Sequence, residues 1–230
     1  MAEPGRGSDA TGVRRLVLVR HGQTAWNLEG RAQGHTDVSL DATGRAQARA
    51  MAAYVGAMSP TALWCSDLAR ARETAAYVET ATGLTARPDA RLREFDVGLR
   101  AGLTVAEFAR RFPDEHAVWA AGHVTGGVPG SETTAEVTGR MVPVLRAVLA
   151  ATAVGETSVV VTHGAALRVS LAALLGWPDG LDLTLRAMDN CGWSTVEEEP
   201  SRGRPRLASY NETAHPGVHT PDFASDAPVG

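Results

Sequence analysis

The sequence predicts an α/β fold, and three features of the chain indicate it. Short apolar runs have the length of buried strands, a polar turn follows each run, and a helical pattern follows each turn. The runs lie at residues 16–19, 62–64 and 158–162. Two later runs, at residues 193–197 and 207–210, are expected to pair as antiparallel strands at the edge of the sheet.

The first helices are predicted from their ends. Asp41 is expected to cap an alanine-rich helix that reaches about Met58. Ser66 or Asp67 is expected to cap a second helix that ends near Thr82. At each of these positions a side-chain oxygen can accept a hydrogen bond from an unpaired N–H group of the first turn.

Two Thr-x-x-Glu sequences match the capping box, in which threonine and glutamate satisfy each other's backbone N–H groups. They begin at Thr104 and Thr133, so helices should start one residue later. A compact apolar helix is expected over residues 165–175, because Gly176 can end it.

Residues 112–131 carry glycines and prolines at irregular spacing, so we expect a loop or lid there. A chain of 230 residues suits one large domain, which we place at residues 14–213. Residues 1–13 are expected to be a flexible N-terminal segment. Residues 214–230 are polar and contain proline, and they are expected to be disordered.

Charge and composition exclude several classes of function. The formal net charge is -4 and the isoelectric point is near 6.0, so neither nucleic acid nor an anionic membrane is an expected partner. All 22 basic residues are arginines. The absence of lysine excludes a phosphate-loop lysine and a Schiff base.

The chain is expected to be cytoplasmic. Its first fifteen residues are polar and lead into four apolar ones, too few for an export signal or a membrane span. Cys65 and Cys191 are far apart and suggest neither a disulfide framework nor a zinc cluster. A cysteine phosphatase is also disfavoured, because Ala71 stands where Cys65 would need an arginine.

Side chains suited to phosphate chemistry follow two of the predicted strands. An Arg-His-Gly triplet begins at Arg20, directly after the first strand, and a His-Gly pair begins at His163 after a later one. Ligands bind at such strand ends in open α/β folds. The triplet alone could be an ordinary surface turn, but two similar strand ends can face one cleft.

Two further segments add charge to this set. Arg70 lies in the first turn of a predicted helix, whose N-terminal N–H groups favour an anion nearby. Glu94 supplies a carboxylate on a glycine-bearing loop. The alternative for this carboxylate is an ion pair with Arg91 or Arg93.

Five stretches carry a family resemblance, in the family's order between Leu16 and Arg168: LVLVRHGQTAWN, QGHTDVSLDATGRAQA, SDLARARETA, LREFDVG and VVVTHGAALR. With them the chain resembles the histidine phosphatase superfamily, the phosphoglycerate mutase-like proteins, in its phosphatase branch. The resemblance implies a three-layer α/β/α sandwich, with a mostly parallel central sheet and an antiparallel edge strand. It also implies a phosphomonoester hydrolase that needs no metal and no cofactor.

The resemblance further implies a role for each site residue. His21 is phosphorylated and then hydrolysed, while Glu94 protonates the departing alcohol and later accepts a proton from water. Guanidinium groups bind phosphate well because they match its oxygens bidentately and stay charged. His163 is implied to belong to the catalytic set as well. The residues implied to bind the phosphoryl group are Arg20, Asn27, Arg70, His163 and Gly164.

The expected substrate is a small phosphorylated metabolite, such as a sugar phosphate or a phosphoglycerate-type ester. Arg100 and Ala101 stand where many family members carry Trp-Glu. The resemblance therefore does not predict which residues form the rim of the pocket. The candidate substrate contacts are Gln33, Gly34, His35, Arg100 and His123.

Two other functions stay open from the sequence. One is a cofactor-dependent phosphoglycerate mutase, although the segment from Glu94 to His163 is short for a mutase and has no lysine for a second phosphate. The other is a non-catalytic module that binds a phosphorylated ligand, although such a module would be expected to lose a catalytic residue. Family members often pair through sheet edges or helices, and the edge near Trp193 is a candidate interface for a homodimer.

Overall fold

The computed structural model describes residues 12–124 and 126–214, and these residues form the predicted α/β fold. The strands are β1 (Arg14–Arg20), β2 (Ala62–Cys65), β3 (Arg87–Pro88), β4 (Thr157–Thr162), β5 (Trp193–Glu199) and β6 (Arg204–Glu212). The α-helices are α1 (Ala25–Leu28), α2 (Ala42–Ala57), α3 (Ala69–Thr82), α4 (Val105–Arg111), α5 (Pro113–Ala120), α6 (Thr134–Ala151) and α7 (Gly164–Leu175). Short 3-10 helices are η1 (Ala90–Leu92), η2 (Gly98–Arg100) and η3 (Leu181–Thr184). The segments expected to be flexible, 1–13 and 214–230, lie almost wholly outside the described residues.

The six strands form one sheet in the order β3-β2-β4-β1-β5-β6. β1, β2, β3 and β4 pair in parallel, whereas β5 runs antiparallel to both of its neighbours. The mostly parallel sheet and the antiparallel pair at its edge are therefore confirmed. Trp193, expected near the exposed edge, lies in β5 and is only 3% exposed, because β6 forms the outer edge.

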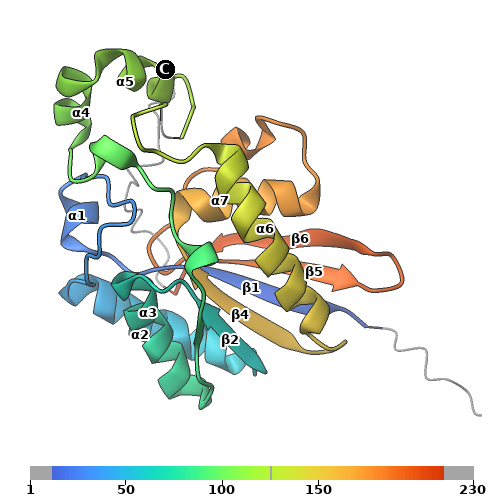
Figure 1. The fold of residues 1–230 in the computed structure, drawn as a ribbon. Coiled ribbons are helices and arrows are strands. Elements are labelled where there is room, and N and C mark those ends of the chain that lie inside the picture. Colours follow the sequence, from blue (N-terminus) through green and yellow to red (C-terminus); the bar gives the residue numbers. More distant parts are fainter. Residues whose placement is uncertain (1–11, 125, 215–230) are drawn as a thin grey trace, which may run out of the picture.

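Helices cover both faces of the sheet and give the molecule three layers (Figure 1). Successive side chains of β1 point to opposite faces, so Leu16 and Leu18 pack with α6 and α7. Val17 and Val19 pack with α2 and α3 on the other face. Because β1 and β4 are parallel neighbours, the loops that leave them lie at the same edge of the sheet.

Most helix ends are formed by the predicted residues. Asp41 caps α2 by accepting a hydrogen bond from the N–H group of Gly44 at 2.7 Å. Complete capping boxes begin α4 at Thr104 and α6 at Thr133. Gly176 ends α7 with a φ of 69°, a left-handed conformation that glycine adopts without steric cost.

The start of α3 differs from the prediction. The N-cap residue is Leu68, so neither Ser66 nor Asp67 caps the helix. The N–H group of Ala69 instead donates to the carboxylate of Asp37, at 2.6 Å. A loop distant in sequence supplies the acceptor, which a local capping pattern cannot reveal.

The loop expected at residues 112–131 contains a helix, α5, and is only partly irregular. Pro113 stands in the first turn, where proline is tolerated because the N–H group that it lacks would have no helical partner. We call α4 and α5 together the helical cap. Its small core is formed by Phe108, Trp119 and Val128, and it lies beyond one end of the sheet (Figure 1).

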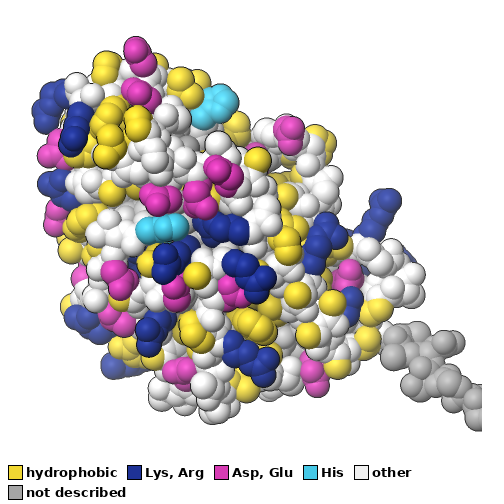
Figure 2. Space-filling model, in the orientation of Figure 1, with side chains coloured by type: hydrophobic (Ala, Val, Ile, Leu, Met, Phe, Trp, Pro, Cys, Tyr) yellow, Lys and Arg dark blue, Asp and Glu magenta, His cyan; other side chains and the backbone are white. Residues whose placement is uncertain are grey.

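The surface mixes charges of both signs. Arginine and carboxylate side chains are interspersed over the face shown in Figure 2. None of the helices in the described part of the chain has the length and hydropathy needed to cross a membrane.

Candidate active site

The loops that leave β1 and β4 bring two histidines together. The imidazole rings of His21 and His163 lie edge to face, with their centroids 5.1 Å apart. A pocket of about 400 Å³, including the part open to solvent, lies beside His21. It is lined by Arg20, His21, Asn27, Gln33, Gly34, Arg70, Glu94, Phe95, Val97, Val124 and Ala165.

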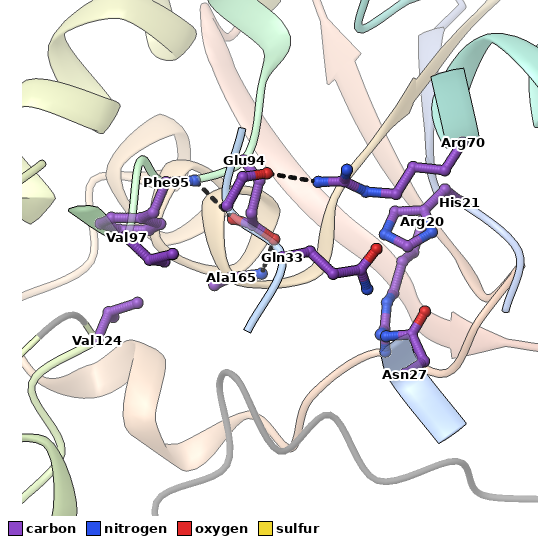
Figure 3. Close-up of a pocket in the computed structure, with 11 residues that line it drawn as sticks. Arg20, His21, Asn27, Gln33, Arg70, Glu94, Phe95, Val97, Val124 and Ala165 are labelled. Atoms are coloured by element: carbon purple, nitrogen blue, oxygen red, sulfur yellow. Dashed lines mark hydrogen bonds between the residues drawn. The ribbon is translucent and has the colours of Figure 1, made fainter. Parts of the chain in front are cut away.

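The pocket has two chemically different sides (Figure 3). One side carries cationic groups that attract a phosphate, so the organic part of a bound ester would lie against the opposite side of the pocket. The cationic side holds Arg20, His21, Asn27 and Arg70, and the opposite side holds Glu94, Phe95, Val97 and Val124.

His21 is held in one tautomer. Its Nδ1 lies 2.7 Å from the carbonyl oxygen of Gly22. Because a carbonyl can only accept, Nδ1 carries the proton and Nε2 keeps its lone pair. Burial, together with the charges of Arg70 and Arg20, lowers the pKa of His21 well below its usual value. The ring is therefore neutral, which is the form that can act as a nucleophile.

Both arginines of the site are buried and are held by backbone carbonyls. Arg20 donates from Nη1 to the carbonyl oxygen of Met188. Arg70 donates to the carbonyl oxygens of Gly34 at 2.8 Å and Thr36 at 2.9 Å. These carbonyls fix the position of each guanidinium group, which stays charged at any working pH.

Asn27 is oriented by the first turn of α1. Its Oδ1 accepts from the N–H group and from the hydroxyl of Thr24, both at 3.1 Å. Because the amide oxygen faces this capping box, the Nδ2 group is the end of Asn27 that can donate to a bound phosphate.

His163 lies next to His21 and outside the pocket lining. It is fully buried, and its Nε2 forms a 2.8 Å hydrogen bond with the hydroxyl of Ser66. Burial and the charge of Arg70 lower the pKa of His163 well below its usual value. Within the described part of the chain its Nδ1 makes no hydrogen bond. Gly164, the other residue expected at this strand end, begins α7.

Glu94 reaches the N-terminus of α7. Its Oε1 accepts from the N–H groups of Phe95 at 2.9 Å and Ala166 at 2.8 Å, and its Oε2 accepts from Ala165 at 3.2 Å. The N-cap residue of this helix, His163, forms no side-chain cap. The carboxylate of Glu94 therefore satisfies helix N–H groups that would otherwise lack a partner.

Arg91 and Arg93, the partners that the sequence suggested for Glu94, are engaged elsewhere. Arg91 lies 2.7 Å from the carboxylate of Asp89, and Arg93 lies 2.6 Å from that of Asp67. The second pair also accounts for Asp67, which does not cap α3.

The remaining predicted contacts are only partly brought together. Gln33 and Gly34 line the pocket. His35 does not line it, and its Nε2 donates to the carbonyl oxygen of Glu94 at 2.8 Å. His123 is exposed and also lies outside the lining.

Arg100 lies below the helical cap, outside the residues that line the pocket. It is 2% exposed, and its guanidinium carbon lies 4.6 Å from the ring centre of Phe108 and 4.7 Å from that of Trp119. Aromatic faces attract a guanidinium group, which explains why this arginine points inward and not to the pocket rim.

Sequence reasoning missed the apolar part of the pocket lining. Phe95 and Val97 alternate along LREFDVG, and side chains two residues apart can share one side of an extended segment, so this signal was present. Val124 falls in the stretch that was expected to be a loop and gave no such signal.

Comparison with known proteins agrees with this geometry. A model of the histidine phosphatase superfamily, branch 1, matches residues 16–213. Glucosyl-3-phosphoglycerate phosphatase of Mycobacterium tuberculosis is 36% identical over 215 residues, which cover 88% of this chain and 96% of that protein. A Yersinia enterocolitica protein named probable phosphoglycerate mutase GpmB is 34% identical over 207 residues, which cover 87% and 94%.

Solved structures give the same result. The mycobacterial glucosyl-3-phosphoglycerate phosphatase in complex with VO3 matches with a TM-score of 0.79 and 34% identity, covering 87% of this chain and 100% of that one. YhfR of Bacillus stearothermophilus matches with a TM-score of 0.79 and 27% identity, covering 87% and 98%. The chain therefore belongs to the histidine phosphatase superfamily and has the phosphoglycerate mutase-like fold. It is a phosphatase of that family, a phosphoric monoester hydrolase.

Proposed function

We propose that this phosphatase hydrolyses a small phosphorylated metabolite through a phosphohistidine formed on His21. The observation that carries the proposal is a neutral His21, with Nε2 unprotonated, in one pocket with Arg20, Arg70 and Glu94. Phosphoryl transfer depends mainly on positioning and on stabilising charge over the phosphoryl oxygens. A nucleophile, two cations and an acid in one pocket supply both.

The first step forms the phosphoenzyme. Nε2 of His21 attacks phosphorus with its lone pair while the bond from phosphorus to the ester oxygen breaks. A phosphate dianion bound beside Glu94 favours the protonated form of its carboxyl, which gives the proton to the departing alcohol. Arg20, Arg70 and the Nδ2 group of Asn27 hold the phosphoryl oxygens.

The second step releases phosphate. Water attacks the phosphorus of the phosphohistidine, and Glu94 accepts a proton from that water. The electrons of the P–N bond return to Nε2 of His21, which restores the neutral imidazole. The same donors stabilise the phosphoryl group in both steps, so one pocket serves the whole cycle.

We propose that the reaction needs neither a metal nor a cofactor. The guanidinium groups of Arg20 and Arg70 can stabilise the charge that a metal ion stabilises in other phosphatases. Enzyme treated with a chelator and desalted should keep full activity. Activity that is lost and then restored by a divalent cation would contradict this.

We infer that the ester is of the sugar phosphate or phosphoglycerate type. Phe95, Val97 and Val124 form an apolar wall opposite the phosphate-binding side, which suits a compact organic group. The Mycobacterium tuberculosis relative is named for glucosyl-3-phosphoglycerate, so that ester should be tested first. A phosphate-release screen over glycosylated phosphoglycerates, sugar phosphates and nucleotides will rank these substrate classes. A preference for nucleotides would count against an ester of the sugar phosphate or phosphoglycerate type.

A mutase is the second candidate, because the GpmB protein matches with similar identity. Between Glu94 and His163 the chain has no lysine to hold a second phosphate, which favours water as the final acceptor. The purified enzyme should release phosphate from its best ester faster than it isomerises 3-phosphoglycerate. The opposite order would make it a mutase.

A cytoplasmic location and a homodimer stay part of this proposal. Cys65 and Cys191 are buried free thiols, which suits a reducing compartment. Cell fractionation tests the location. Sedimentation tests pairing, for which β6 and not β5 offers the outer sheet edge.

The nucleophile is tested with His21→Ala. Wild-type enzyme denatured in alkali during turnover should carry an alkali-stable, acid-labile phosphate, and His21→Ala should carry none and lose activity. His116→Gln, on the helical cap, controls for the loss of a histidine and should keep the labelled phosphoenzyme. A labelled His21→Ala would refute the assignment of the nucleophile.

A further inference from the structure

Three backbone carbonyls within residues 91–94, the segment that carries the acid residue, accept hydrogen bonds from one arginine of α6. Nη1 of Arg140 donates to the carbonyl oxygens of Arg91 and Arg93, and its Nη2 donates to that of Glu94, each at 2.8 Å. The same guanidinium group forms a two-bond ion pair with Glu132, with both N–O distances 2.8 Å. One side chain thus ties the segment before the acid to α6.

Glu132 holds the same loop on the other side of the acid. Its Oε2 accepts from the N–H group of Asp96 at 2.8 Å, and its own N–H group donates to the carbonyl oxygen of Asp96 at 2.9 Å. The Arg140 and Glu132 side chains are 18% and 22% exposed, so solvent only partly screens the pair. The backbone is therefore held both before and after Glu94.

We propose that the ion pair of Arg140 and Glu132 positions Glu94 for proton transfer to the leaving alcohol. This inference rests on the proposed function, in which Glu94 is the general acid. Neither residue of the pair lines the pocket, so both act through the loop and are positioning residues. A displacement of the acid by about 1 Å can lower a rate about 100-fold, so an ion pair that fixes the backbone around Glu94 can have a large effect on the rate.

The leaving group separates positioning from general stability. Phenolate and alkoxides need a proton as they depart, whereas 2,4-dinitrophenolate departs readily without one. A misplaced Glu94 therefore slows phenyl phosphate and spares 2,4-dinitrophenyl phosphate. A variant that merely loosens the protein slows both esters by the same factor.

The test compares kcat/KM for the two esters in Arg140→Met, Glu132→Gln and Arg146→Met. kcat/KM covers the steps up to release of the alcohol, so it reports the acid step and not the later hydrolysis of the phosphoenzyme. Arg140→Met should lower kcat/KM about 10- to 100-fold for phenyl phosphate and less than about threefold for the dinitrophenyl ester. Arg146, exposed on the same helix, is the matched control, and its variant should change neither value.

Equal losses on both esters in Arg140→Met would overturn the proposal. If circular dichroism shows that this variant does not fold, Glu132→Gln decides by the same ratio, because it keeps the side-chain shape but removes the charge and one of the two acceptor oxygens. Failure of the proposed function looks different. In that case Glu94→Gln itself would not change the ratio between the esters.

Discussion

A single methyl group at Gly44 should damage both stability and catalysis. Gly44 lies in the first turn of α2, directly against the turn that follows His21. A Cβ at this position would lie 2.0 Å from the carbonyl oxygen of Gln23 and 2.7 Å from its nitrogen. Non-bonded heavy atoms prefer separations of about 3.5 Å, so helix and turn must separate by more than about 1 Å.

The size of the effect follows from this overlap. Forcing extra volume into a packed site costs about 1–3 kcal/mol. The separation also strains the 3.0 Å hydrogen bond from the N–H group of Asp41 to the carbonyl oxygen of Gln23. Gly44→Ala should therefore lower the free energy of unfolding by about 2 kcal/mol, or Tm by about 4–8 °C. Because the turn carries His21, kcat/KM should also fall about 100-fold.

The matched control is the same substitution in another helix. A Cβ at Gly139, within α6, meets no described atom within 4 Å. Alanine is the better helix former by about 1 kcal/mol, so Gly139→Ala should raise Tm by about 2–4 °C and leave kcat/KM unchanged. Thermal unfolding and steady-state kinetics measure both variants. If Gly44→Ala is as stable and as active as Gly139→Ala, the close approach of α2 to the nucleophile turn does not exist.

Three further predictions concern single groups. Arg70→Met should lower kcat/KM about 100- to 1000-fold. The substitution also removes a charge that lowers the pKa of His21, so the acidic limb of the pH profile should move to higher pH. The control Arg72→Met, at an exposed position of the same helix, should show neither change. Burial and then Arg70 lower the pKa values of His21 and His163, so below about pH 6.5 the unfolded chain binds protons that the folded one does not. The urea concentration at the midpoint of unfolding should therefore fall as the pH drops from 7 to 5. A rise would contradict the lowered pKa values of the two histidines. Burial raises the pKa of Cys65 to about 11, so its thiol should react with a disulfide reagent at pH 8 only after unfolding, and fast labelling of the native protein would refute its burial.

The sequence predicts elements well where the cause is local. The capping boxes at Thr104 and Thr133 form as expected, because both partners lie within one helical turn. The central strands are found because fully buried parallel strands must be apolar on both faces. The family motifs predicted that His21, Arg70 and Glu94 share a pocket, and the structure brings them together.

Prediction fails where the cause comes from a distant segment. Asp37 accepts the hydrogen bond that a local cap would accept at the start of α3. Asp67, a predicted cap, instead forms an ion pair with Arg93, 26 residues away in the sequence. Arg100 was expected near the substrate because of its place in the sequence, but two aromatic rings from the helical cap hold it inside. Nothing near Arg140 in the sequence indicates that it binds the loop of the acid residue.

The helical cap has a core of its own, separate from the two cores that flank the sheet. This core is linked to the pocket by Arg100, which donates a hydrogen bond to the carbonyl oxygen of Val124 in the apolar wall. The phosphate side is built on β1, α1 and α3, whose residues are not part of that core. Selection can therefore reshape substrate preference by changing the cap while the chemical step stays intact. Libraries randomised only in α4 and α5 should yield enzymes that differ in the ester they accept and resemble one another in the phosphoenzyme they form.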